Sequence, residues 1–355
     1  MVVAEQIFAH RKNMTHRCLP IFIPHMACNN NCVFCNQKRI AGTVAPPTVA
    51  EVKAMLKKGL CFAGGTTHIA FFGGSFTGIE KKQMIAYLKV AKQFVDMGDY
   101  CGIRVSTRPD YISEDILKIL KRYNVTTIEL GTQSLDNGVL AASKRGHTAN
   151  DVYKAVELIR QYGFELVLQM MVGLPKDDEK KAMQTGRKIV KLAPDGVRIY
   201  PTVVIKDTEL AEMYEKGEYT PLSLDEAVDI STKLLSLFEK NNIPVIRIGL
   251  HSDESLTDGD SIVAGPFHSS FGEMCHSRIY YKLICKSLKT KEYKDIIIRC
   301  ALGEISKITG NRKANIKRLK AEMGIKKVKI IESPKLTPKK IRITSLVKQS
   351  KEGLF

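Results

Sequence analysis

Three cysteines lie close together near the N-terminus, and their spacing constrains this chain more than any other feature. Cys28, Cys32 and Cys35 have three and two residues between them, so their thiolates can face one metal centre. A structural zinc site closes its tetrahedron with four protein ligands, and an ordinary four-iron cluster takes four cysteines. Three cysteines leave one iron of such a cluster without a protein ligand, so a small molecule can occupy that position.

The composition describes a globular chain of 355 residues whose thiols are reduced. Nine cysteines is an odd number in a chain too long to need disulfide bridges, and six of them are scattered, so we expect those six to be small buried residues. No run approaches the roughly 20 apolar residues of a membrane span, and no secretory signal is evident. We therefore expect a cytoplasmic protein that makes no membrane contact.

Positive charge is concentrated at the C-terminal end. The net charge is +18, and residues 286–355 hold 20 Lys or Arg against six Asp or Glu. A segment this basic suits an anionic partner, most simply nucleic acid bound through its phosphates. The alternative is a solvated surface that only keeps the protein soluble.

Strand-like and helical patterns alternate over the first 240 residues. Strands are predicted at 19–24, 68–72, 103–107, 127–131, 165–172 and 197–203, and helices at 48–60, 80–97, 113–123, 151–162, 178–192 and 224–240. Six such units predict parallel strands joined by helical crossovers, as a partial (β/α)6 TIM-like barrel. A flat doubly wound sheet is the alternative.

The pattern changes after the sixth unit. It predicts one more strand at 243–250, an aromatic-bearing helix at 274–288, and strands at 328–331 and 341–346. These elements form a small basic α+β C-terminal extension. We expect the barrel domain to occupy residues 1–245 and the extension to occupy 246–355.

The segments able to bind a ligand each follow a predicted strand, at the edge where loops of parallel α/β folds converge on a site. Gly73, Gly74 and Ser75 follow the second strand. Paired glycines let the backbone approach a ligand closely, and strand-end carbonyls can accept hydrogen bonds from an ammonium group. An ordinary turn is the alternative interpretation.

Charged and amide side chains follow the third and fourth strands. Arg108 can pair with a ligand carboxylate or cap a neighbouring helix. Glu129 lies in an apolar strand, where a buried carboxylate needs a partner; a ligand hydroxyl or a barrel arginine can provide one. Gln133 offers both a donor and an acceptor. In the following segment, Thr148 or Asn150 is expected to cap a helix while the basic residues of 144–148 face solvent.

Met171 and Gly173 lie at the end of the fifth strand. This segment can lie along an adenine ring, which needs apolar contact and backbone hydrogen bonds. Core packing is the alternative role for the methionine.

Together these segments resemble the radical S-adenosylmethionine (SAM) superfamily, and more narrowly the family of the Elongator catalytic subunit and its bacterial relatives. Several strings in the same order are more specific than any one of them. Over residues 18–280 the resemblance rests on the cysteine motif and on 73–77, 129–134, 145–148, 198–201 and 206–210.

The resemblance implies a partial barrel in which Cys28, Cys32 and Cys35 hold a 4Fe-4S cluster. The open iron of this cluster would bind the amino and carboxylate groups of SAM. Reductive cleavage of SAM would then give methionine and a 5′-deoxyadenosyl radical that abstracts hydrogen from a substrate. The implied SAM contacts are Gly73, Gly74 and Ser75 for the methionine end, Glu129 and Gln133 for the ribose, and Met171 and Gly173 for the adenine.

The resemblance also names partners. It makes RNA, with a tRNA base first, the expected substrate, docked on the basic C-terminal segment, and it implies an electron donor such as ferredoxin or flavodoxin. About 75 residues follow Tyr280, too few for the acetyltransferase domain of the Elongator subunit, so acetyl transfer is not expected. One alternative is a radical enzyme acting on a porphyrin or lipid. Another is a non-enzymatic RNA-binding protein with a structural zinc ion and His25 as its fourth ligand.

Overall fold

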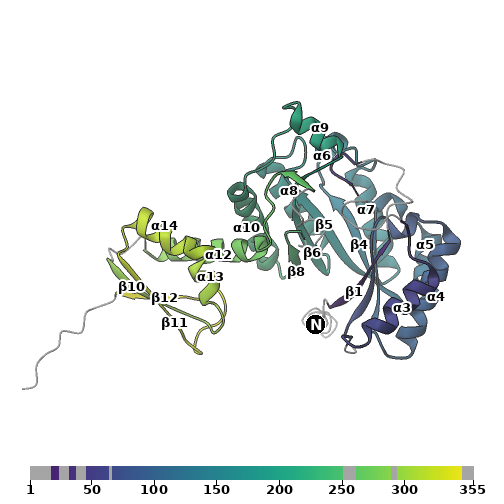
Figure 1. Ribbon diagram of the computed structural model, residues 1–355, viewed down its shortest axis with the longest axis horizontal. Coiled ribbons are helices and arrows are strands. Elements are labelled where there is room, and N and C mark those ends of the chain that lie inside the picture. The colour runs from purple at the N-terminus through teal and green to yellow at the C-terminus, as the bar shows by residue number, and fades with distance from the viewer. Residues whose placement is uncertain are drawn as a thin grey trace, which may run out of the picture.

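The computed structural model describes residues 17–23, 32–36, 45–63, 66–250, 261–288 and 294–345. A parallel sheet of seven strands in the order β1-β2-β3-β4-β5-β6-β8 dominates it (Figure 1). The strands are β1 (Cys18–Ile23), β2 (His68–Gly73), β3 (Gly102–Thr107), β4 (Val125–Gln133), β5 (Glu165–Val172), β6 (Gly196–Pro201) and β8 (Val245–Ile248). The predicted partial barrel is confirmed, with the run at 243–250 supplying its seventh strand.

Helical crossovers join these strands. The long ones are α3 (Val49–Gly59), α4 (Lys81–Asp96), α5 (Glu114–Arg122), α7 (Ala149–Gln161), α8 (Glu179–Leu192) and α10 (Leu224–Lys240). Shorter pieces are η1 (Phe76–Gly78), η2 (Pro109–Tyr111), α6 (Asn137–Ala142) and α9 (Glu209–Glu215). Thr48, Thr148 and Ser223 begin their helices with capping boxes, in which side chain and backbone satisfy each other's free groups. Thr148 is thus the N-cap predicted for this segment.

Alternation along each strand separates an apolar core from a polar inner face. On β4, Ile128 and Leu130 join the main core between the sheet and its helices, whereas Glu129 between them belongs to the opposite face. On β3, Ile103 and Val105 are core residues, and Arg104 lies between them. The inner face of the barrel therefore carries charged groups that the helices do not cover.

The C-terminal extension has its own core. Helix α12 (Phe271–Leu288) packs on α10 and leads to a second sheet in the order β11-β10-β12. Its elements are β10 (Asp295–Cys300), α13 (Ile305–Thr309), η3 (Asn311–Lys313), α14 (Ala314–Met323), β11 (Lys327–Glu332) and β12 (Arg342–Ser345). Strands β7 (Val204–Ile205) and β9 (Ile262–Ala264) form a separate two-stranded antiparallel sheet. The division between residues 245 and 246 stays a prediction; it falls within β8, which is hydrogen-bonded to β6. Within the described parts of the chain, no helix combines the length and the apolar character needed to span a bilayer.

Candidate functional site

Cys32 and Cys35 lie in one tight turn after β1. The Cys35 amide donates to the Cys32 carbonyl at 3.0 Å, and the turn is anchored by Val33. The amide of Val33 donates to Ser143 O at 3.3 Å, and its carbonyl accepts from the amide of Leu210 at 2.8 Å. Cys32 is buried and Cys35 is partly exposed. Both thiols are thus held against the loop after α6 and the start of α9; Cys28, the third predicted ligand, lies outside the described residues.

Two buried arginines contact the Cys32 sulfur. Arg145 Nη1 donates to Cys32 Sγ at 3.1 Å, and Arg145 Nη2 donates to Gly131 O at 2.7 Å. Arg108 Nη1 lies 3.9 Å from the same sulfur, while its Nε and Nη2 each donate to the Asp110 carboxylate at 2.9 Å. These guanidinium groups place positive charge beside the Cys32 sulfur, and positive charge favours the thiolate, the form in which a cysteine binds metal.

The prediction that the basic residues of 144–148 face solvent is wrong for Arg145. Only 6% of its surface is exposed, whereas neighbouring Lys144 is exposed and pairs with Glu209. Arg145 turns inward because the loop returns over the end of β4, where the Gly131 carbonyl accepts its hydrogen bond. The Arg108 side chain pairs with Asp110, and its contact with a ligand carboxylate stays a prediction.

His147 lies behind these arginines and is uncharged at neutral pH. Burial lowers its pKa to about 4, and the nearby Arg145 acts in the same direction. Its Nδ1 lies 4.0 Å from Asp110 Oδ1. His147 therefore adds no positive charge beside Cys32 at neutral pH.

The predicted glycine turn packs on the end of β1. Gly73 has a φ of +105°, and a Cβ added there would lie 2.5 Å from the Ile23 carbonyl oxygen. The Gly74 amide donates to that same oxygen at 2.9 Å, and Ser75 is buried. A residue with a side chain would separate the turn from the strand that leads into the cysteine loop. The turn thus approaches the backbone of β1 closely; its approach to a ligand and its contact with the amino group of methionine stay predictions.

Glu129 has arginine partners from two other strands. Its carboxylate accepts from Arg198 Nε at 2.8 Å and from Arg198 Nη2 at 3.1 Å, and Arg104 Nη2 lies 3.1 Å away. Glu129 and Arg104 are 2% and 1% exposed. Of the two partners considered for this carboxylate, the structure provides the barrel arginine. The guanidinium of Arg198 also lies over the ring of Phe72, 5.5 Å from its centroid.

Gln133 belongs to the same inner face. It is buried, has a φ of +62° and accepts a hydrogen bond from Gln169 Nε2 at 3.4 Å. Gln133 pairs with buried Met170 on β5, and Met171, the next residue of that strand, is partly exposed. Contacts of Glu129, Gln133 and Met171 with ribose or adenine stay predictions.

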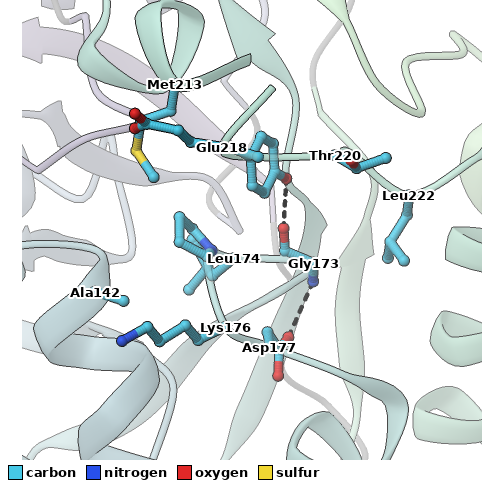
Figure 2. A pocket seen from close by; sticks show the side chains of 11 residues that line it. Ala142, Gly173, Leu174, Lys176, Asp177, Met213, Glu218, Thr220 and Leu222 are labelled. Carbon is cyan, nitrogen blue, oxygen red and sulfur yellow. Dashed lines mark hydrogen bonds between the residues drawn. The ribbon is translucent and has the colours of Figure 1, made fainter. Parts of the chain in front are cut away.

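A cavity of about 270 Å³ opens beside Gly173, at the end of β5 (Figure 2). The Gly173 amide donates to Asp177 Oδ2 at 3.0 Å, and its carbonyl accepts from the Tyr219 hydroxyl at 2.6 Å. Burial raises the pKa of Asp177 to about 6. Leu222 closes one side of the glycine, where a Cβ would meet it at 2.8 Å. The cavity adjoins the segment predicted to contact adenine.

Cys32, Gly73, Arg108, Gln133 and Gly173 lie at or beyond the carboxyl ends of β1, β2, β3, β4 and β5 in turn, and Glu129 lies midway along β4. Within the described residues, no three His, Cys, Asp or Glu side chains gather as metal ligands. Two thiols on one turn with arginines beside them, and a glycine turn without side-chain bulk, nevertheless fit a cluster and a small ligand bound to it.

Two family models match the chain. The model of the radical SAM superfamily matches residues 22–189, and the model of the radical SAM C-terminal domain matches residues 194–281. Together they cover most of the barrel and end within α12. The matches leave residues 282–355 outside both families.

Curated relatives point in the same direction. The "tRNA uridine(34) acetyltransferase" of Methanocaldococcus jannaschii is 31% identical over 199 residues, which are 55% of this chain and 36% of that protein. "Elongator complex protein 3" of Saccharomyces cerevisiae is 32% identical over 139 residues, which are 38% and 25% of the two chains. The chain thus spans about a third or less of the length of these relatives.

A solved structure has the same fold. It is an archaeal Elp3 from Methanocaldococcus infernus with an N-terminal deletion, and it superposes with a TM-score of 0.59 at 23% identity. The match covers 76% of this chain and 63% of that one.

Proposed function

The chain belongs to the radical SAM superfamily, as its sequence motifs predicted, and from this premise we propose that it modifies RNA, with a tRNA base as the first candidate. The resemblance to the Elongator subunit family is likewise confirmed. The chain is a radical SAM enzyme with a 4Fe-4S cluster and SAM as its cofactors. What remains to be proposed is which residues hold these cofactors and what the substrate is.

Cys28, Cys32 and Cys35 are the proposed cluster ligands. Support comes from the turn that presents Cys32 and Cys35 together and from Arg145, which donates to the Cys32 sulfur. When bound and reduced, the cluster supplies the electron that cleaves SAM to methionine and a 5′-deoxyadenosyl radical. The electron comes, in this proposal, from a donor such as ferredoxin or flavodoxin.

The proposed SAM contacts follow the order of the strands along the sheet. They are Gly73, Gly74 and Ser75 for the methionine end, Glu129 and Gln133 for the ribose, and Met171 and Gly173 for the adenine. Glu129 can serve both its arginines and a ribose hydroxyl, because a carboxylate offers about four acceptor sites. Arg104 and Arg198 fix its orientation toward the inner face.

RNA is the proposed substrate because of one observation above all. The sequence similarity covers 55% of this chain and reaches a relative whose name states that it acts on tRNA uridine 34. The excess of 20 basic over six acidic residues in 286–355 supports the same conclusion, since phosphate groups are the natural partner of such a segment.

The test is an assay of RNA before and after reaction. Anaerobically reconstituted full-length protein is incubated with SAM, dithionite and bulk tRNA from a strain that lacks the gene. We expect a new nucleoside in the digested RNA by mass spectrometry, dependent on SAM and absent with Cys32→Ala. Unaltered RNA, together with 5′-deoxyadenosine formation stimulated by a porphyrin or lipid extract, would instead favour a small-molecule substrate.

A further inference from the structure

We propose that the open face of the sheet β11-β10-β12 binds the phosphate backbone of base-paired RNA. This inference rests on the proposed function and adds the surface that receives the substrate and the form of RNA that fits it. The sheet begins at Asp295, beyond residue 281 where the family match ends. The surface therefore belongs to a part of this chain that the family models do not describe.

The two faces of this sheet differ sharply. Along β10, Ile296, Ile298 and Cys300 are buried, whereas Ile297 and Arg299 between them are partly exposed. The buried face packs against α12, α13 and α14, which lie on one side of the sheet (Figure 1). The other face has none of these helices on it.

The strand register determines which side chains share the open face. Paired residues of neighbouring strands point to the same side. Lys327 pairs with Asp295, Lys329 pairs with Ile297, and Arg342 pairs with Arg299. Both lysines and Arg342 are exposed. The open face thus gathers side chains from all three strands.

This face is strongly cationic. It carries four basic side chains, Arg299, Lys327, Lys329 and Arg342, against the single carboxylate of Asp295. Arg299 Nη1 donates to the Thr344 hydroxyl at 3.2 Å, which holds its guanidinium along the sheet. An array of fixed and mobile cations on a flat surface complements a row of phosphates.

The chemistry of the face favours paired over unpaired RNA. Sites for single strands combine a cationic groove with aromatic side chains on which bases stack. The residues of β10, β11 and β12 include no aromatic side chain. Base-paired RNA turns its bases inward and presents phosphates and 2′-hydroxyl groups, which Arg, Lys and Thr side chains recognise.

The experiment compares two pairs of lysines in the full-length protein. Binding is measured, without SAM or reductant, to an RNA hairpin of about 16 base pairs and to an unpaired strand of equal length. The test variant is Lys327→Ala/Lys329→Ala. The control is Lys317→Ala/Lys320→Ala, which removes the same charge from exposed positions of α14 on the covered side.

We expect the wild type to prefer the hairpin. The sheet variant should bind it roughly 10- to 100-fold more weakly at 0.1 M salt, with a salt slope smaller by about 2. The control should change affinity by less than about threefold, because α14 packs on the opposite face of the sheet from the proposed RNA and salt screens exposed charges.

Three results would overturn the inference: equal losses in both variants, tighter binding of the unpaired strand, or binding of phosphatidylserine vesicles without binding of the hairpin. Unchanged thermal unfolding shows that both variants fold, and SAM cleavage measured without RNA should be unchanged in both. If the wild type binds the hairpin but never alters RNA, the proposed function is contradicted, whereas the inference that the cationic face binds RNA still stands.

Discussion

Arg145 Nη1 donates a hydrogen bond to Cys32 Sγ at 3.1 Å, although the two residues lie 113 positions apart in the sequence. Both are buried, and the Gly131 carbonyl holds the other terminal nitrogen of the same guanidinium. Hydrogen bonds and positive charge at a cluster sulfur stabilise the more negative, reduced cluster and so raise its reduction potential. We therefore propose that Arg145 positions Cys32, the proposed cluster ligand, and tunes the potential of the cluster.

The first prediction concerns this pair. Arg145→Met should make the midpoint potential of the reconstituted cluster more negative. The potential of Arg145→Lys should lie between those of Arg145→Met and the wild type. Potentiometry followed by electron paramagnetic resonance measures both. Lys144→Met, at the exposed neighbouring position, is the control and should leave the potential unchanged. A cluster that stays bound at the wild-type potential in Arg145→Met would show that the hydrogen bond has no electrostatic role.

The buried carboxylate of Glu129 should matter for stability as well as for binding. Glu129→Gln leaves Arg104 and Arg198 without their charged partner, so the free energy of unfolding should fall by about 3–5 kcal/mol. Urea denaturation measures the change. The control is Glu165→Gln, because Glu165 accepts only a hydroxyl hydrogen bond from Thr127 among the contacts described and a glutamine can keep it. Equal losses in the two variants would refute a special role for the arginine pair.

The close approach of Gly73 to β1 predicts a specific sensitivity to alanine. Gly73→Ala should destabilise the protein and lower the iron content after reconstitution, because the new Cβ would displace the backbone at Ile23. Gly98→Ala is a matched control: Gly98 also has a positive φ, of +81°, but nothing lies within 4 Å of the added atom. The control should lose about 1–2 kcal/mol and keep its iron. Loss of iron in both variants would assign the effect to backbone strain alone.

The raised pKa of Asp177 predicts how the stability of the protein depends on pH. Its pKa is about 6 in the folded protein and lies near 3.8 when unfolded, because burial disfavours the charged form. Its contribution to stability is complete below the unfolded pKa and is lost as the pH rises through 6. Asp177→Asn should therefore gain stability relative to the wild type between pH 4 and 7, by up to roughly 3 kcal/mol.

Denaturation curves of both proteins across this range check the sign. His147 titrates in the opposite sense, since its lowered pKa makes the folded state more stable as the pH rises from about 4 to 6.5. The difference between wild type and Asp177→Asn removes this shared contribution. A difference that does not vary with pH would show that folding leaves the pKa of Asp177 unshifted.

Local signals in the sequence were enough to predict the barrel. Thr48 and Ser223 begin α3 and α10 because their side chains cap the free amides, and short, nearly continuous apolar runs mark several of the strands. Strand β10 was not predicted, because a run of three isoleucines between Lys294 and Arg299 is too short to show the periodicity of a strand. Its pairing with two strands from later in the chain is what makes that run a strand.

The site was predicted less completely, since long-range contacts decide it. The string at 144–148 reads as a polar loop, and only the return of this loop over β4 turns Arg145 toward Cys32. Arg104 and Arg198 could have been recognised by one signal, a charged residue at an inward position of an otherwise apolar strand. Their convergence on Glu129 depends on the order β3-β4-β5-β6 of the sheet.

The most direct test of the central claim measures SAM cleavage by the protein itself. Wild type and Cys32→Ala are reconstituted anaerobically with iron and sulfide, reduced with dithionite and incubated with SAM. We predict a 4Fe-4S absorbance and formation of 5′-deoxyadenosine and methionine by the wild type, and neither by the variant. A wild-type protein that retains zinc in place of the cluster and forms no 5′-deoxyadenosine, or a variant that cleaves SAM at the wild-type rate, would contradict it.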